Sequence, residues 1–224
     1  MSKIDVDNIN KSWNKKIEEM GIYDYMVYSP FSDEYWNQQK KIVICNLETF
    51  GYDDCGVINV NIDQFAQWFR ATNITKTCRY SIVFIYGLLL KLQHNYVDIN
   101  ILKQKYKEED ELLSVLPKIT YMNIRKHSNP NINQDIQGII HESILYKDEL
   151  CAFIDALTPD ILLIGGRVGA YVLGEVLSST IPFNSNIQIG NTLVCSVRHF
   201  SRFNYSYYLD KINEIGNLIL NSDH

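Results

Sequence analysis

The stretch DILLIGGRVGAYVLGEVL, residues 160–177, joins an apolar run, two adjacent glycines and a segment with helical periodicity. The branched apolar run predicts a buried strand, because strands covered on both faces are apolar along their whole length. The glycines predict a tight turn, and the residues after them predict a helix. A strand, a turn and a helix in succession form the unit from which parallel α/β sheets are built.

Similar apolar runs occur at three other places. KKIVICNLETFGYDD (40–54) and PKITYMNIRKHSNPN (117–131) each open into a polar loop, and NTLVCSV (191–197) is a further apolar strand. Strands that alternate with helices predict right-handed crossovers and a mostly parallel sheet. We therefore expect an α/β fold whose central sheet is flanked by helices.

Helices are expected between and after these strands. The patterns that predict them cover residues 8–20, 61–70, 79–93, 103–116, 147–157 and the chain from about 205 onward. The β-branched run within 79–93 leaves a strand open as the alternative there, and 103–116 is predicted to be a solvated helix. No repeat or linker divides the chain, so we expect a single domain over residues 1–224.

The composition is that of an ordinary globular protein. The 224 residues are 46% hydrophobic and 21% charged, with a net charge of −5. The longest apolar run, 82–92, is too short for a membrane span, and the N-terminus lacks a signal-peptide pattern, so a cytoplasmic location is expected. Five cysteines without a CxxC pair favour reduced thiols over disulfides or zinc. The acidic balance argues weakly against nucleic acid, although a local basic patch would suffice for binding.

Polar residues follow each predicted strand, in the stretches 46–48, 123–127, 165–167 and 198–202. The carboxyl ends of parallel strands lie along one edge of a sheet, and α/β sheets bind their ligands at that edge. The last stretch lies in CSVRHFSRF (195–203), where a strand releases two arginines, a histidine and an aromatic. We therefore expect the functional site at this edge.

Four features of this edge have a functional and a structural interpretation. Glu48 could polarise a water, or be a solvated loop carboxylate. Asn123 could read the edge of a pyrimidine, or cap its own turn. His199 could donate a hydrogen bond to a developing anion, or be structural. The glycines of GGRVGA (165–170) could approach a phosphate, or simply let strand and helix pack closely.

Taken in chain order, these segments resemble the uracil-DNA glycosylase superfamily. NLETFG (46–51) falls where the family has its first signature loop, and RHFSRF (198–203) falls where it has His-Pro-Ser. ITYMNI (119–124) resembles the strand that carries the family's base-reading asparagine. Thr49 and Phe200 stand at family proline positions, and Asn46 at a family glycine position. The resemblance covers about residues 40–60 and 117–210.

The resemblance implies a central, mostly parallel four-stranded sheet, with residues 61–116 as a helical insertion. It implies a monofunctional DNA glycosylase that extrudes a base and hydrolyses its N-glycosidic bond. The catalytic residues would be Glu48, which holds water and favours the cationic sugar, and His199, which stabilises the departing base. Asn123, Phe50 and Asn46 would bind the base. DNA would be contacted by Arg198, Ser201, Arg202, Phe203, Gly165, Gly166 and Arg167, with Phe203 either wedged into the vacated stack or packed against the last helix.

Alternative functions remain open at this stage. The altered first loop suits a glycosylase for another modified base, such as those of viral DNA, and the replaced prolines suit a nucleic-acid-binding member without catalysis. A small-molecule α/β hydrolase or transferase ranks lower, because no Gly-x-Ser-x-Gly nucleophile elbow is present. The expected partner is DNA carrying an extruded pyrimidine. No cofactor, metal, membrane or obligate protein partner is predicted.

Overall fold

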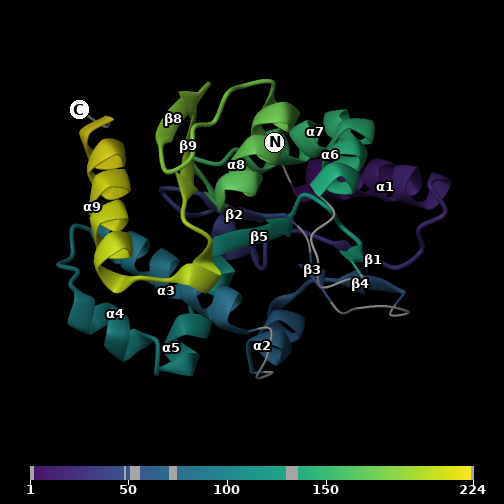
Figure 1. Ribbon diagram of the computed structural model, residues 1–224. Helices are drawn as coiled ribbons and strands as arrows, with labels where there is room; N and C mark the ends of the chain where they lie inside the picture. Colours follow the sequence, from purple (N-terminus) through teal and green to yellow (C-terminus); the bar gives the residue numbers. More distant parts are fainter. Residues whose placement is uncertain (1–2, 48, 51–55, 71–74, 130–135, 223–224) are drawn as a thin grey trace.

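The fold is built around a central β-sheet (Figure 1). The computed structural model describes residues 3–47, 49–50, 56–70, 75–129 and 136–222. The sheet has five strands in the order β5–β2–β7–β9–β8. Their bounds are Ile42–Asn46 for β2, Ile119–Asn123 for β5, Ile161–Gly165 for β7, Asn186–Ile189 for β8 and Thr192–Val197 for β9.

The first four strands in that order pair in parallel, and β8 pairs antiparallel with β9. The predicted α/β fold with a mostly parallel sheet is confirmed, but the expected count of four strands is wrong. The fifth strand, β8, arises from a hairpin in which Ile189 faces Thr192, so only Gly190 and Asn191 form the turn. Gly190 has a φ of +56°, which such turns require and glycine tolerates.

Helices cover both faces of the sheet (Figure 1). Alternate residues of β2 point to opposite faces, because side chains alternate along a strand. Val43 and Cys45 join one hydrophobic core, and Ile42 and Ile44 join the other. The first core includes α1 (Lys3–Glu19), α6 (Ile136–Leu145), α7 (Lys147–Leu157) and α8 (Arg167–Leu177); the second includes α2 (Ile62–Arg70), α3 (Thr75–Leu92), α4 (Ile99–Lys105), α5 (Glu109–Leu113) and α9 (Tyr205–Ser222).

Residues 61–116 supply much of the second helical layer. The long helix α3 buries Ile82, Phe84 and Ile85 in the same core as the sheet residues Ile44 and Tyr121. Together with α9, this segment covers one face of the sheet. The helical interpretation of 79–93 is confirmed, and its strand alternative is wrong.

The predicted helix over 103–116 is wrong as a continuous element. Helix α4 ends at Lys105 and α5 begins at Glu109. Across this break the Lys105 ammonium forms ion pairs with Glu108 and Glu111, so the charges that suggested one solvated helix instead connect two short ones. A 3₁₀ turn over Leu116–Lys118 then leads into β5.

Short elements complete the chain. Two small parallel pairs lie outside the central sheet: β1 (Tyr25–Val27) with β4 (Val57–Asn59), and β3 (Thr49–Phe50) with β6 (Ser128–Asn129). Further 3₁₀ turns span Asp33–Tyr35 and Phe200–Arg202. In the part of the chain that the structure describes, no helix has the length and apolar character needed to cross a membrane.

Candidate functional site

The strand order defines a switch point between β2 and β7. The chain passes from β2 to β5 on one side, and the next strand, β7, lies on the other side of β2. In open α/β sheets such a reversal opens a crevice beyond the strand ends, and ligands bind there. The strands on either side of this switch point end at Asn46 and Gly165, two residues that the sequence had placed in the site.

The side chain of Asn46 lies against the β7 turn. A Cβ atom added to Gly165 would lie 3.8 Å from Asn46 Oδ1 and 3.3 Å from Phe200 Cδ2. Phe200 itself is fully buried in the second core, so its ring fixes the loop by packing. Asn46 Nδ2 is buried and has no hydrogen-bond acceptor among the described residues. A buried donor without an acceptor costs about 1–3 kcal/mol, so this amide needs an explanation.

His199 lies over the neighbouring glycine. Gly166 has φ +89° and ψ 158°, a conformation essentially restricted to glycine. Its N–H donates to Val197 O at 2.8 Å, and an added Cβ would lie 3.5 Å from His199 Cβ and 3.6 Å from His199 Cδ2. The glycine turn after β7 and the loop after β9 therefore meet at the imidazole.

Hydrogen bonds fix the tautomer of His199. The backbone N–H of Ser201 donates to His199 Nδ1 at 3.3 Å, and Ser201 Oγ lies 2.7 Å from the same nitrogen. Because a backbone N–H can only donate, Nδ1 is the acceptor and the ring proton is on Nε2. Among the described residues, Nε2 has no hydrogen-bond partner. Burial, helped by the charge of Arg202, lowers the pKa of His199, so the ring is neutral at pH 7.

Two arginines of this loop, Arg198 and Arg202, are exposed to solvent. Arg198 stacks its guanidinium over the Tyr207 ring, 4.4 Å from the ring centre, and Arg202 follows His199 in the 3₁₀ turn. Within the described ranges neither arginine forms an ion pair with a carboxylate. Exposed arginine side chains without a carboxylate partner are able to bind phosphates.

Phe203 is stacked on both faces. Its ring centre lies 4.4 Å from that of Tyr80 in α3 and 4.3 Å from that of Tyr208 in α9, with interplanar angles of 10° and 7°. The Phe203 ring is half-buried and packs against the second hydrophobic core. The structure therefore favours the packing interpretation of Phe203 over the wedge.

Asn123 and the first predicted loop lie on the other side of Asn46. Asn123 ends β5 in register with Asn46 and is buried. The segments that follow β2 and β5 stay paired beyond the strand ends. The Arg125 N–H donates to Leu47 O at 2.8 Å, and Phe50 is in register with Asn129. The pairing places the backbone of Phe50 beyond Asn46 on the same segment. Glu48 lies outside the described residues.

A second polar cluster at this edge was not anticipated from the sequence. Arg125 and His127 follow β5 and both contact Glu142 of α6: Arg125 Nε and His127 Nε2 lie 3.0 Å and 2.6 Å from Glu142 Oε2, and a second guanidinium nitrogen pairs with Glu142 Oε1. Burial raises the pKa of Glu142, but hydrogen bonds from His127 and Arg125 outweigh it, so the pKa is lowered overall. The polar run 123–127 was noted in the sequence, but helix α6 was not predicted, so its acidic partner was missed.

Lys126, which lies between Arg125 and His127 in the sequence, is fully buried. Its ammonium donates to Asn10 Oδ1 at 2.9 Å and Asn14 Oδ1 at 3.0 Å and lies 3.9 Å from the Trp13 ring centre. Burial holds the pKa of Lys126 well below its usual range. These bonds tie the end of β5 to α1.

The site combines residues that lie at the ends of β2, β7 and β9. In the ranges that the structure describes, no three histidine, cysteine, aspartate or glutamate side chains gather as a metal site would require. The Arg167 guanidinium lies over the ring of Phe183, 5.4 Å from its centre. Comparison with protein-family models and with curated proteins finds no match to this chain.

Proposed function

We propose that this protein is a DNA glycosylase that releases uracil, or a related 5-substituted pyrimidine, from an extruded nucleotide. One observation supports this most directly: a neutral imidazole, a glycine turn and a buried asparagine meet at the switch point of the sheet. Among the residues that the structure describes, neither the Nε2–H of the imidazole nor the Nδ2–H of the asparagine has an acceptor. A pyrimidine offers carbonyl oxygens that could accept both hydrogen bonds. The resemblance of the signature loops points to the same chemistry.

The dimensions of the edge suit a flat ring. Asn123, Asn46 and Gly165 end three adjacent strands. Strands are spaced by about 4.8 Å, so Asn123 and Gly165 are separated by about 10 Å, with Asn46 between them. A base lying over Asn46 would have one amide at its edge and the imidazole on its opposite side.

In the proposed reaction the bond between sugar C1′ and base N1 breaks and its electron pair moves onto the base. His199 Nε2–H donates to the base oxygen where negative charge develops, and the neutral ring does so without giving up a full proton. A water adds to C1′ and loses a proton, and the departing base anion takes up one proton, so the products are the free base and an abasic sugar. The family resemblance assigns the water to Glu48, and Arg198 and Arg202 would hold flanking phosphates.

The test is a base-release assay on labelled single- and double-stranded oligonucleotides that carry one uracil or 5-substituted uracil. Abasic sites are scored by alkaline strand cleavage. We expect release by the wild type and a loss of about 10²–10³-fold in rate for His199→Ala, the usual effect of removing one oxyanion donor. His141→Ala, which removes an exposed histidine of α6, is the matched control and should release base at the wild-type rate.

Two results would overturn the proposal. Release from none of these substrates, together with tight binding to the same oligonucleotides, would favour a binding protein without catalysis. Equal rates for wild type and His199→Ala would show that the imidazole takes no part.

A further inference from the structure

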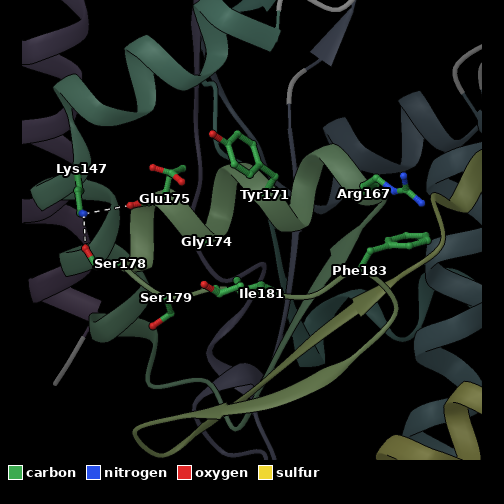
Figure 2. Close-up of a pocket in the computed structure, with 10 residues that line it drawn as sticks. Lys147, Arg167, Tyr171, Gly174, Glu175, Ser178, Ser179, Ile181 and Phe183 are labelled. Atoms are coloured by element: carbon green, nitrogen blue, oxygen red, sulfur yellow. Dashed lines mark hydrogen bonds between the residues drawn. The ribbon is translucent and has the colours of Figure 1, made fainter.

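A groove of about 480 Å³ runs along the outer side of α8 (Figure 2). One wall is the exposed face of α8, one end is closed by α7, and the other wall is the segment 178–183, which follows α8. Its side chains include Lys147, Arg167, Tyr171, Glu175, Ser178 and Phe183. Only Arg167 belongs to the predicted site.

The groove has a cation at each end. Arg167 lies over the Phe183 ring at 5.4 Å, and Lys147 donates to Glu175 O at 3.1 Å and to Ser178 Oγ at 2.6 Å (Figure 2). Neither cation is ion-paired with a carboxylate among the described residues. Glu175 is the one acidic side chain of the described lining, so the groove keeps a net positive charge in a protein of net charge −5. An anionic ligand fits this balance.

Two aromatic rings of the groove face solvent. Tyr171 is 54% exposed and Phe183 is 38% exposed, although large apolar rings are normally buried. Exposed rings beside cations are the combination that binds single-stranded nucleic acid, because bases stack on the rings while the cations contact the phosphates.

The groove begins at the candidate site. Arg167 directly follows Gly166, against which the His199 ring is packed. Helix α8 has 11 residues and is therefore about 16 Å long, which spans about four or five nucleotides at the rise of about 3.4 Å per nucleotide in a stacked strand. A strand that leaves the extruded nucleotide would enter the groove at Arg167.

We infer that the α8 groove binds the single-stranded DNA segment adjoining the extruded nucleotide, with Phe183 and Tyr171 stacking on bases and Arg167 and Lys147 contacting phosphates. The inference rests on the proposed function for the position of the extruded nucleotide. It predicts preference for a substrate whose flanking segment is unpaired.

The test is fluorescence anisotropy with a labelled 12-nucleotide oligothymidylate, which reports binding without any base release. Phe183→Ala and Tyr171→Ala should each weaken binding by about 5- to 150-fold, the usual effect of losing one stacked base. Tyr96→Ala, at a 77% exposed tyrosine between α3 and α4, is the matched aromatic control and should bind like the wild type. Thermal unfolding of each variant checks that the fold is retained.

Charge variants separate DNA from other ligands. Lys147→Ala should lower the slope of log affinity against log salt by about 0.7, as expected for one lost contact to a single strand. Glu175→Gln should tighten binding, because it removes the charge that repels phosphate. Weaker binding by Glu175→Gln, or equal competition by oligoglutamate at the same ionic strength, would overturn the inference, since a groove for a cationic or an acidic peptide would behave in that way.

The two proposals fail differently. If the wild type releases base but Phe183→Ala and Tyr171→Ala bind oligothymidylate like the wild type, the groove inference is wrong and the glycosylase proposal stands. If these variants lose binding while the wild type releases no base, the groove is supported and the glycosylase proposal is wrong.

Discussion

His199 and His127 both follow strands of the central sheet, but their rings have opposite kinds of partner. His127 contacts Glu142, which also holds the Arg125 guanidinium, and the side chains of that ion pair are only 9% and 11% exposed. His199 contacts the hydroxyl and N–H of Ser201 and keeps one ring nitrogen free of described partners. One cluster satisfies its charges internally, whereas the other leaves a donor available.

This difference distinguishes polar residues that stabilise the fold from polar residues that are available to a ligand, although both groups lie at the same edge of the sheet. A buried charge is tolerated only when it is paired, and a fully paired group has no capacity left for a ligand. The loop that carries His199 is held instead by apolar packing, since Phe200 and Phe203 anchor it to α3 and α9. Polar groups that are positioned by aromatic packing remain free to react.

The largest expected effect is on the internally paired cluster. Glu142→Gln should lower the free energy of unfolding by about 3–5 kcal/mol, because it leaves the Arg125 guanidinium buried without its counter-charge. Urea denaturation measures this loss. The double variant Arg125→Met with Glu142→Leu should recover much of it, because neither charge is then buried alone. A loss below 1 kcal/mol in Glu142→Gln would mean that this cluster is solvated after all.

The next largest effect concerns Phe203, whose ring anchors the loop that carries His199. Phe203→Ala should reduce the free energy of unfolding by on the order of 3 kcal/mol, as for the loss of a packed phenylalanine. Urea denaturation and oligonucleotide affinity should be measured on the same sample. Unchanged stability with weakened DNA affinity would restore the wedge role and would contradict the packing interpretation.

Two glycine variants test the contribution of the Gly166 turn, against which the imidazole packs. Gly166→Ala should cost about 1–3 kcal/mol of stability, because its backbone conformation excludes other residues, and should also slow base release by moving His199. Gly190→Ala is the control, since Gly190 has φ +56° in open space at the distant β8–β9 turn. It should cost about 1–2 kcal/mol and leave base release unchanged. Equal rates for the two variants would show that the Gly166 turn does not position the site.

The smallest effect is on the pH dependence of stability. The folded-state pKa of His199 is lowered, so the unfolded chain binds this proton more readily and stability falls as pH decreases below about 6.5. His199→Gln should flatten the curve in that window. The lowered pKa of Glu142 affects stability at more acidic pH. The stabilisation that this carboxylate contributes is lost as pH falls below about 4.3. Chemical denaturation between pH 3 and 8 at fixed ionic strength separates the two groups, and an unchanged curve near pH 6 would contradict the His199 assignment.

Local patterns in the sequence predicted the four parallel strands and most of the long helices. The fifth strand was missed, although Gly190-Asn191 between Ile189 and Thr192 is a hairpin signal. Contacts between distant segments were not predictable in this way. The pairing of Arg125 with Glu142 requires helix α6 to lie beside the end of β5, and the stacking of Phe203 requires Tyr80, which is more than one hundred residues away in the sequence.

The ring of Phe203 belongs to a longer column of stacked aromatics, formed by Tyr106, Tyr80, Phe203, Tyr208 and Phe200. The column begins at the end of α4 and reaches Gly165, the last residue of β7, so it joins one helical layer to the switch point. A displacement of the loop that carries the imidazole must slide at least one of these rings off its neighbour. Tyrosine absorption and near-ultraviolet circular dichroism therefore offer an intrinsic optical signal for any movement of that loop when DNA binds.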